Sequence, residues 1–274
     1  EIRKMVRCKV KDHKAIASFL AIIFLLSSIC YYIRITGGEA AAGMTSILMF
    51  CPAIAAFIVQ IVYYRRVKIL GWRRCKLRYI VAGTLIPFLY LGFSYGVFWI
   101  VAGRTFTGRL STSSVGILLL LIPSSLLTAA GEEIGWRGFL LPKMTEVWHV
   151  KTALLLSGLI WAVWHFPLMI VGLYQAGTPV WYQLPLFTIE ILAVAAILGT
   201  IRLQSKSVWP AIFLHAAHNY FDQIIFSPLT EDGISHYFVG ETGIITAAFA
   251  CLTAILLIKR TAARDVLNAK LPAV

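Results

Sequence analysis

Charged residues are scarce in this chain. Only 14% of its 274 residues are charged and 59% are hydrophobic, whereas ordinary soluble domains have roughly 25% charged and 45–50% apolar residues. A soluble domain needs a polar surface, so this composition argues against one. The chain is therefore expected to be an integral membrane protein.

Cysteine is also sparse. The five cysteines form no CxxC or CxxxC pair, so we expect neither disulfide bonds nor a thiolate metal site. The HExxH helix of zinc peptidases is missing as well. A catalytic site in this chain is therefore expected to use neither cysteine ligands nor an HExxH zinc motif.

Long apolar segments follow one another along the whole chain. A helix that spans a bilayer needs about 20 mostly apolar residues, and the connections between such segments are short, without a soluble domain or linker. We therefore predict one all-α transmembrane domain over 1–274, a polytopic bundle of about eight helices with its motif-bearing core at about 114–226. The predicted spans are 15–34, 45–64, 79–102, 114–141, 152–173, 182–202, 207–226 and 240–258.

The net charge of +13 is distributed as a membrane topology would distribute it. Basic residues gather in the connections on one side, which the positive-inside rule assigns to the cytoplasm. An even number of spans then puts both termini in the cytoplasm. Because orientation explains the basic excess, we expect a lipid bilayer and no nucleic acid as partner. The inner set is Arg3, Lys4, Arg7, Lys9, Lys11, Lys14, Arg65, Arg66, Lys68, Arg73, Arg74, Lys76, Arg78, Arg137, Lys143, Lys151, Arg202, Lys206, Lys259, Arg260, Arg264 and Lys270; the outer side has Arg34, Arg104 and Arg109 with the acidic Glu231 and Asp232.

The first polar cluster inside an expected span is the stretch GEEIGWRGF, residues 131–139. A carboxylate in hydrocarbon is costly unless it is paired, protonated or facing water. Glu133 and Arg137 are four residues apart, so on a helix they share a face and form an ion pair. Glu132 is left without that partner and is free for chemistry. The plainer alternative is a cytoplasmic helix end with an ordinary salt bridge.

Two later spans contain histidine. In WAVWHFPL, Trp161 and His165 are four residues apart and face the same way, and Pro167 is expected to disturb the helix just beyond them. The alternative for this histidine is a place in an interfacial aromatic belt. In FLHAAHNYFD, His215 and Asn219 share a face at the same spacing.

Two more polar residues remain in the later spans. His218 is expected to point away from its neighbours on the same helix and to meet Asp222. Glu190, in the middle of LFTIEILAV, is either a structural partner within the bundle or a carboxylate with a task of its own.

Depth favours a shared site for the three clusters. At 1.5 Å per residue, Glu132 lies about 15 Å from the cytoplasmic end of its span, His215 about 12 Å and His165 about 20 Å. A carboxylate, two imidazoles and a carboxamide at one depth suit hydrolysis. Glu132 would act as general base on water with His165 orienting it, and His215 with Asn219 would donate N–H groups to an oxyanion.

These motifs also resemble a known family, the CAAX protease and bacteriocin-processing (CPBP) enzymes, which include the type II CAAX prenyl endopeptidases and are glutamic intramembrane proteases. The family pattern is EExxxR, then an aromatic residue shortly before a histidine, then HxxxN. Here these read Glu132 to Arg137, Trp161 to His165 and His215 to Asn219, over about residues 120–225. Trp161 stands where phenylalanine is common.

The resemblance implies roles and partners. Glu132 and His165 would activate water, His215 and Asn219 would stabilise the oxyanion, and Glu133 with Arg137 would shape the site. The substrate would be a lipidated C-terminal peptide or another membrane-near peptide, reached from the cytosolic leaflet, and no cofactor is implied. The membrane would be the plasma membrane of a prokaryote or the endoplasmic reticulum of a eukaryote.

Rival readings stay open at the level of sequence. Two histidines and a glutamate also match a three-ligand zinc site, although Asn219 beside His215 is a poor zinc ligand. A non-catalytic immunity or scaffold protein is a second alternative. The third is a proton-coupled transporter, for which Glu190 would supply the additional intramembrane carboxylate.

Overall fold

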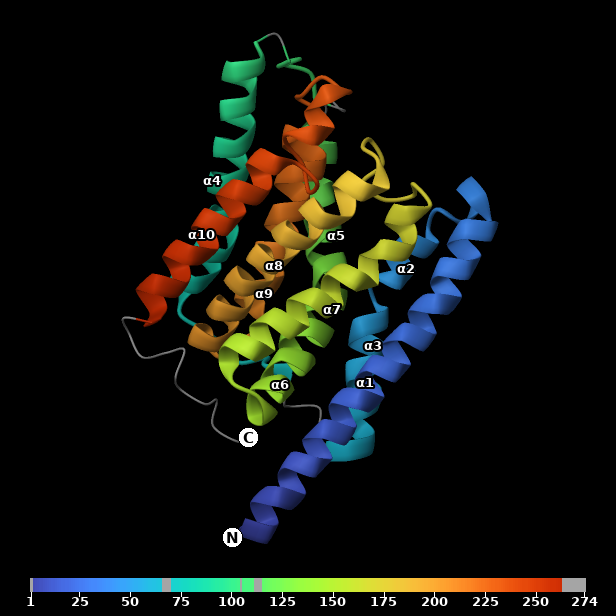
Figure 1. Ribbon diagram of the computed structural model, residues 1–274, viewed down its shortest axis with the longest axis vertical. Helices are drawn as coiled ribbons and strands as arrows, with labels where there is room; N and C mark the ends of the chain where they lie inside the picture. The colour runs from blue at the N-terminus through green and yellow to red at the C-terminus, as the bar shows by residue number, and fades with distance from the viewer. Residues whose placement is uncertain (1, 66–69, 104, 111–114, 263–274) are drawn as a thin grey trace.

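The computed structural model describes residues 2–65, 70–103, 105–110 and 115–262. Within these ranges every regular element is a helix, and the helices form an elongated bundle (Figure 1). The predicted all-α, multi-pass membrane bundle is therefore confirmed. Of the basic residues used for orientation, Arg66, Lys68, Arg104, Arg264 and Lys270 lie outside the described residues.

The N-terminal half holds a long helix, a bent pair and a second long helix. The break inside the bent pair follows from Pro52, which sits in the first turn of its second helix, where proline fits a helix start but ends any helix before it. The two arms differ in direction by 41°. The elements are α1 (Ile2–Thr36), η1 (Gly38–Ala41), α2 (Met44–Leu48), α3 (Cys51–Val59), η2 (Gln60–Tyr64) and α4 (Leu77–Ala102).

The C-terminal half contains the motif-bearing helices. Two of them change from α-helix to π-helix directly after motif residues, at Glu133 and at Asn219. The elements are α5 (Val115–Glu133), η4 (Ile134–Leu140), α6 (Leu141–Val147), α7 (Val150–Ile170), α8 (Val180–Ser205), α9 (Trp209–Asn219), η5 (Tyr220–Phe226), η6 (Ile234–Tyr237) and α10 (Ile244–Ala262).

The number of spans differs from the prediction. Length and apolarity select six helices in the described residues, or seven when the bent pair counts as one span. The expected span 207–226 is present as α9 and η5 but is not among the six, because its histidines, Asn219 and Asp222 lower its hydropathy. Its polar residues face protein instead of lipid: His215, His218 and Asp222 are all buried.

The expectation about Pro167 was wrong, because Pro167 does not interrupt α7, which continues to Ile170. The fourth span, expected to end at residue 141, runs on past Pro142 through α6 to Val147. In a membrane bundle, neighbouring groups satisfy the carbonyl that proline leaves without a donor, so a proline inside a helix is tolerated.

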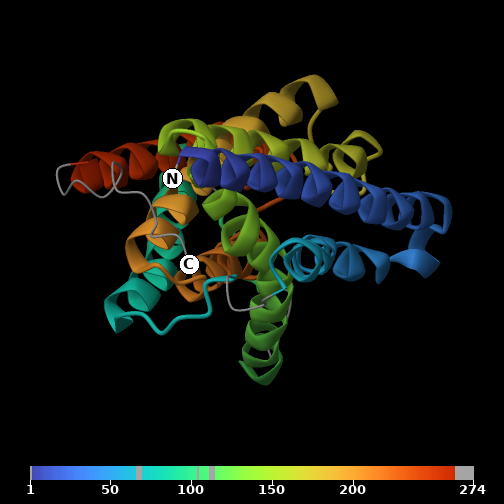
Figure 2. The same ribbon diagram turned by 90° about the horizontal axis from the view of Figure 1, so that it is seen from below.

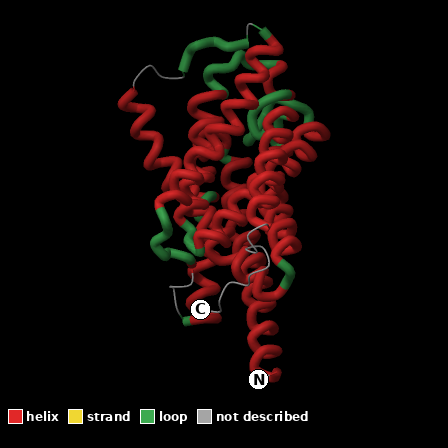
Figure 3. The backbone as a smooth tube through the Cα atoms, turned by 90° about the vertical axis from the view of Figure 1, so that its left-hand side faces the viewer, coloured by secondary structure: helices red, strands yellow, loops and turns green. Residues whose placement is uncertain are grey.

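Helix α8 lies at the centre of the bundle and positions the others. It packs against α7, α9 and α10, while α4 packs along α9. Seen from below, α1 lies across the α7 side and the start of α5 projects away from the remaining helices (Figure 2). The side chains of Val115, Leu119 and Leu120 on that projecting turn are accordingly exposed. The loops collect largely at the two ends of the bundle (Figure 3).

Candidate active site

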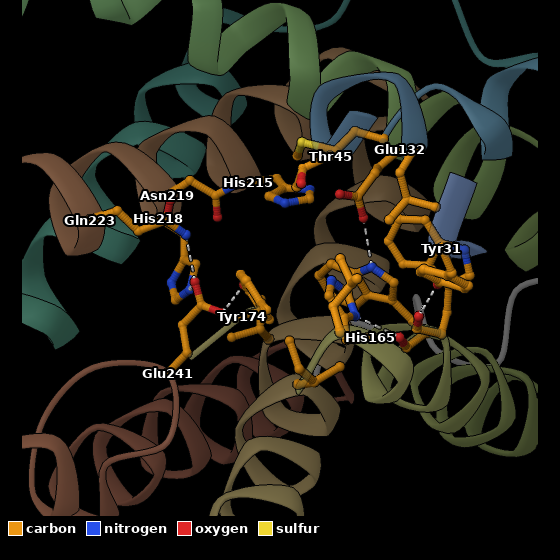
Figure 4. A pocket seen from close by; sticks show the side chains of 17 residues that line it. Tyr31, Thr45, Glu132, His165, Tyr174, His215, His218, Asn219, Gln223 and Glu241 are labelled. Carbon is orange, nitrogen blue, oxygen red and sulfur yellow. Dashed lines mark hydrogen bonds and ion pairs between the residues drawn. The ribbon is translucent and has the colours of Figure 1, made fainter. Parts of the chain in front are cut away.

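A cavity of about 140 Å³ lies between α5, α7 and α9 and is lined by five of the predicted site residues. They are Glu132, Trp161, His165, His215 and Asn219. The side chains of Glu132, His165, His215 and Asn219 point toward a common space from α5, α7 and α9 (Figure 4). The expectation that the three clusters meet is therefore confirmed.

The Glu132 carboxylate is held by one hydrogen bond. Nε1–H of Trp161 donates to its Oε2 at 2.8 Å, while the other oxygen faces the cavity (Figure 4). Residue Glu132 is only 2% exposed. One oxygen is thus fixed in place and the other is left for a ligand or water.

The orientation of His165 follows from its own helix. Its Nδ1 lies 2.8 Å from the carbonyl oxygen of Trp161, and a carbonyl only accepts, so Nδ1 carries the proton. In a neutral ring Nε2 is then an acceptor. The ring also stacks on Tyr174, with centroids 5.6 Å apart. His165 is therefore positioned to accept a proton or a hydrogen bond from within the cavity.

Glu133 connects the first motif to the third. Its Oε1 accepts from Nη1 of Arg137 at 2.8 Å, as predicted, and lies 2.9 Å from Nδ1 of His215. The guanidinium of Arg137 in turn lies 4.0 Å from the centroid of the Trp161 ring. Glu133 is fully buried, so these contacts compensate its charge. A protonated His215 would use Nδ1–H for Glu133 and keep Nε2–H for a ligand.

Close helix contact explains the glycines around the first motif. A Cβ on Gly135 would lie 2.6 Å from the carbonyl oxygen of Pro52, and one on Gly131 would lie 2.7 Å from that of Met49. Small residues let membrane helices approach in this way. The bent pair thereby reaches the cavity, to which Thr45, Leu48 and Met49 contribute.

The expectation for His218 was wrong. It lines the same cavity, and its ring nitrogens face the Tyr90 hydroxyl and, at 3.8 Å, the Glu241 carboxylate. Asp222 instead accepts a hydrogen bond from Tyr95 at 2.8 Å. The π-helix η5, which begins after Asn219, changes which residues follow on each face, so a simple helical wheel misplaced these partners.

Three further polar residues of the cavity were missed. Glu241 accepts hydrogen bonds from Gln223, at 2.9 Å, and from Tyr174, and all three line the cavity opposite Glu132 (Figure 4). Burial, together with the Glu241 carboxylate, holds the pKa of Tyr174 well above its usual range, so this hydroxyl stays a donor. The sequence signal that could have identified Glu241 is its position shortly before the apolar run that forms α10.

Glu190, and a GxSxG stretch within α4, lie outside the cavity. Glu190 is fully buried in α8, and neither of its carboxylate oxygens has a hydrogen-bond partner among the described residues. Gly92–Gly96 reads GxSxG, but it lies inside α4, where Ser94 is buried and donates to the Tyr90 carbonyl at 2.6 Å. It is not the strand-to-helix turn that exposes a nucleophilic serine.

The cavity does not gather a metal-ligand set. In the part of the chain that the structure describes, no three His, Cys, Asp or Glu side chains lie where they can share one metal ion. Instead, Trp161 donates a hydrogen bond to Oε2 of Glu132, and Oε1 of Glu133 lies against Nδ1 of His215.

The fold and the site together define a class: a multi-pass membrane protein with a Glu/His/Asn cavity between its helices. Residues 114–221 match the family model described as Rce1-like, type II CAAX prenyl endopeptidase. A curated relative, "CAAX prenyl protease 2" of Methanococcus maripaludis, is 33% identical over 172 residues, 61% of this chain and 57% of that protein. The motif-bearing region is thus similar to the Rce1-like type II CAAX prenyl endopeptidases, as the resemblance predicted. The match spans little more than half of the relative's length.

Proposed function

We propose that this protein is a membrane-embedded endopeptidase that hydrolyses a peptide bond near the C-terminus of prenylated or other membrane-near peptides. The observation that carries the proposal is that Glu132, His165, His215 and Asn219 line the same cavity. The similarity of the motif-bearing region to a protease family supports a peptide substrate.

In the first step Glu132 acts as general base. Its cavity-facing oxygen takes a proton from a water molecule while the water oxygen attacks the carbonyl carbon of the peptide bond. Trp161 fixes the carboxylate through Oε2, and Nε2 of His165 accepts the second water hydrogen and orients the attack. A positioned base of this kind accounts for roughly 10²–10⁴-fold in rate.

The resulting oxyanion needs donors. His215, through Nε2–H, and Asn219, through its amide N–H, approach the cavity from one face of α9. Each oxyanion donor contributes about 3–4 kcal/mol to the transition state. Glu133 and Arg137 hold His215 in place. Collapse of the intermediate breaks the C–N bond, and Glu132 passes its proton to the leaving amine.

The substrate class rests on similarity. The curated relative is named a CAAX prenyl protease, and a prenylated C-terminal peptide would bring its scissile bond to the bilayer together with its lipid. We infer the same substrate class here, met in the plasma membrane of a prokaryote or the endoplasmic reticulum of a eukaryote.

The test is cleavage of a fluorogenic farnesylated CAAX peptide by detergent-purified protein. Wild type should cleave it with or without a zinc chelator, and Glu132→Gln should lower kcat by at least 10²-fold, because it removes the general base. Loss of activity in chelator with recovery on adding zinc would contradict the metal-free chemistry.

Glu190→Gln is the matched control. It makes the same carboxylate-to-amide change at a buried residue that does not line the cavity. Cleavage should stay within about threefold of wild type, because Glu190 takes part in none of the reaction steps. Loss of cleavage in Glu190→Gln with retention in Glu132→Gln would reverse the assignment. No cleavage by wild type would count against the prenyl-peptide substrate.

A further inference from the structure

A second cavity, of about 220 Å³, enters the bundle from the loop end. It begins at the 227–243 connection, where the Asp232 side chain is 97% exposed, and it reaches Asp222, which is only 2% exposed. Tyr95, Ser227 and His236 add further polar groups to its wall. The cavity therefore connects the surface with a polar region inside a membrane bundle.

The second cavity and the candidate active site share a wall. Gln223 lines both. On either side of it, Tyr174 and Glu241 face the active-site cavity, and their chain neighbours Gln175 and Gly240 face the second one. Gln223 donates to Oε1 of Glu241 at 2.9 Å, and Tyr174 donates to the other oxygen. The wall is thus a hydrogen-bonded layer of Tyr174, Gln223 and Glu241, and at Gln223 a single side chain borders both cavities.

A layer of this kind suits the passage of water. Its hydrogen bonds can be exchanged for bonds to water at little enthalpic cost, and a cavity of this size with several polar partners has room for more than one water molecule. Polar side chains within a membrane bundle are costly to maintain. Neither Gln223 nor Glu241 has a task in the hydrolysis described above, and the Tyr174 hydroxyl, unlike its ring, has none either, so their cost calls for another purpose.

We propose that the second cavity binds water and supplies it to Glu132 through the layer formed by Tyr174, Gln223 and Glu241. This inference rests on the proposed hydrolase function, because each turnover consumes one water molecule. A peptide seated in the active-site cavity of about 140 Å³ displaces the water there. A route on the far side of the substrate replaces that water without release of the peptide.

The first test reads hydration and does not depend on activity. X-ray radiolytic footprinting of the full chain oxidises side chains next to bound water. Tyr95, in the second cavity, and Tyr174, in the layer at the active-site cavity, should be oxidised despite their burial. Ser227→Leu fills the second cavity and should lower oxidation at both by at least fivefold. Unchanged oxidation of Tyr174 in this variant would overturn the proposal.

Two further variants guard against misfolding. Thr242→Leu fills the same cavity from another wall residue and should give the same result. Thr253→Leu is the matched control for Thr242→Leu, since the hydroxyl of Thr253, like that of Thr242, donates to a backbone carbonyl, at 2.8 Å from Phe249 O. Thr253 lines a separate groove between α4 and α10. Thr253→Leu should leave the oxidation of both tyrosines unchanged.

The second test reads turnover of the farnesylated peptide. Ser227→Leu and Thr242→Leu should each lower kcat about tenfold with KM within twofold, because substrate binding is intact and water supply is slow, whereas Thr253→Leu should match wild type. An unchanged kcat in both filled variants would overturn the water route while leaving the hydrolase function standing. Absence of hydrolysis in wild type, with the footprinting result as expected, would instead remove the hydrolase function and leave a hydrated cavity without this purpose.

Discussion

At the scale of single residues, Glu133 links the polar groups of the site although it does not line the cavity. One of its oxygens contacts both Arg137 and His215, and the other has no hydrogen-bond partner among the described residues. A buried charge that loses its partner is more destabilising than the pair is stabilising. The integrity of the site therefore depends on a residue that touches no substrate.

Replacing Glu133 with Gln should both destabilise the protein and lower its activity. The change leaves the Arg137 guanidinium buried without its counter-charge, at a cost of about 3–5 kcal/mol, and frees the His215 ring. We expect a lower Tm by thermal unfolding in detergent and a kcat reduced at least tenfold.

The control for that change is Glu39→Gln. The Glu39 side chain is 94% exposed and lies 3.9 Å from the buried Arg34. Because solvent screens the Glu39 carboxylate, this pair contributes little, and the Tm of Glu39→Gln should match that of wild type. The loss of stability in the double variant Glu133→Gln/Arg137→Gln should be smaller than the sum of the losses in the two single variants, because neither charge is then buried without its partner. Additive losses would contradict the ion pair.

At the scale of elements, the contact between η4 and the bent pair holds the bent pair in place as one wall of the active-site cavity. Gly135 in η4 lies against the backbone of Pro52 at the start of α3. The same bent pair supplies Leu48 and Met49 to the cavity. Any separation of the two elements would therefore open the site.

Gly135→Ala should separate them. Its methyl group would lie 2.4–2.6 Å from atoms of Pro52, too close for any contact, and overpacking of this kind costs about 1–3 kcal/mol. The measurements are the Tm, which should fall, and the KM for the peptide, which should rise. Gly96→Ala in α4, whose added Cβ meets nothing within 4 Å, should leave both unchanged. Equal behaviour of the two variants would refute the close contact.

At the scale of the whole molecule, the two ends of the bundle differ in charge. Lys143 and Lys151 lie at the end where α6 meets α7, while Glu231 and Asp232 lie in the connection before α10. These segments are at opposite ends of the bundle (Figure 1). The positive-inside rule predicts that the end with Lys143 and Lys151 is cytoplasmic, the orientation expected from the sequence.

Cysteine labelling in intact cells checks this orientation. Asp232→Cys should react with a membrane-impermeant thiol reagent added outside, because its side chain is exposed, whereas Lys151→Cys should react only after permeabilisation. The unsubstituted chain provides the blank for its native cysteines. The reverse pattern would invert the topology and move both termini to the outer side.

The limits of sequence prediction are clear at particular residues. The i to i+4 ion pair of Glu133 and Arg137 was predictable, because local helical geometry alone sets it. The partners of His218 were not, since a π-helix begins just after Asn219 and periodicity then changes. Glu241 was missed because it lies outside the motif-bearing core, and only packing of α10 on the bundle brings it to the cavity.

The sequence by itself determined the membrane setting, the all-helical class and the three motifs, because composition and four-residue spacing are local properties that a helix converts directly into faces. Only the tertiary structure decided that Trp161 donates to Glu132, that Glu133 contacts His215 across 82 positions of the chain, and that Tyr174, Gln223 and Glu241 form one layer. These contacts join different helices, and their distances depend on how bends, π-helices and glycine contacts set the helices against each other.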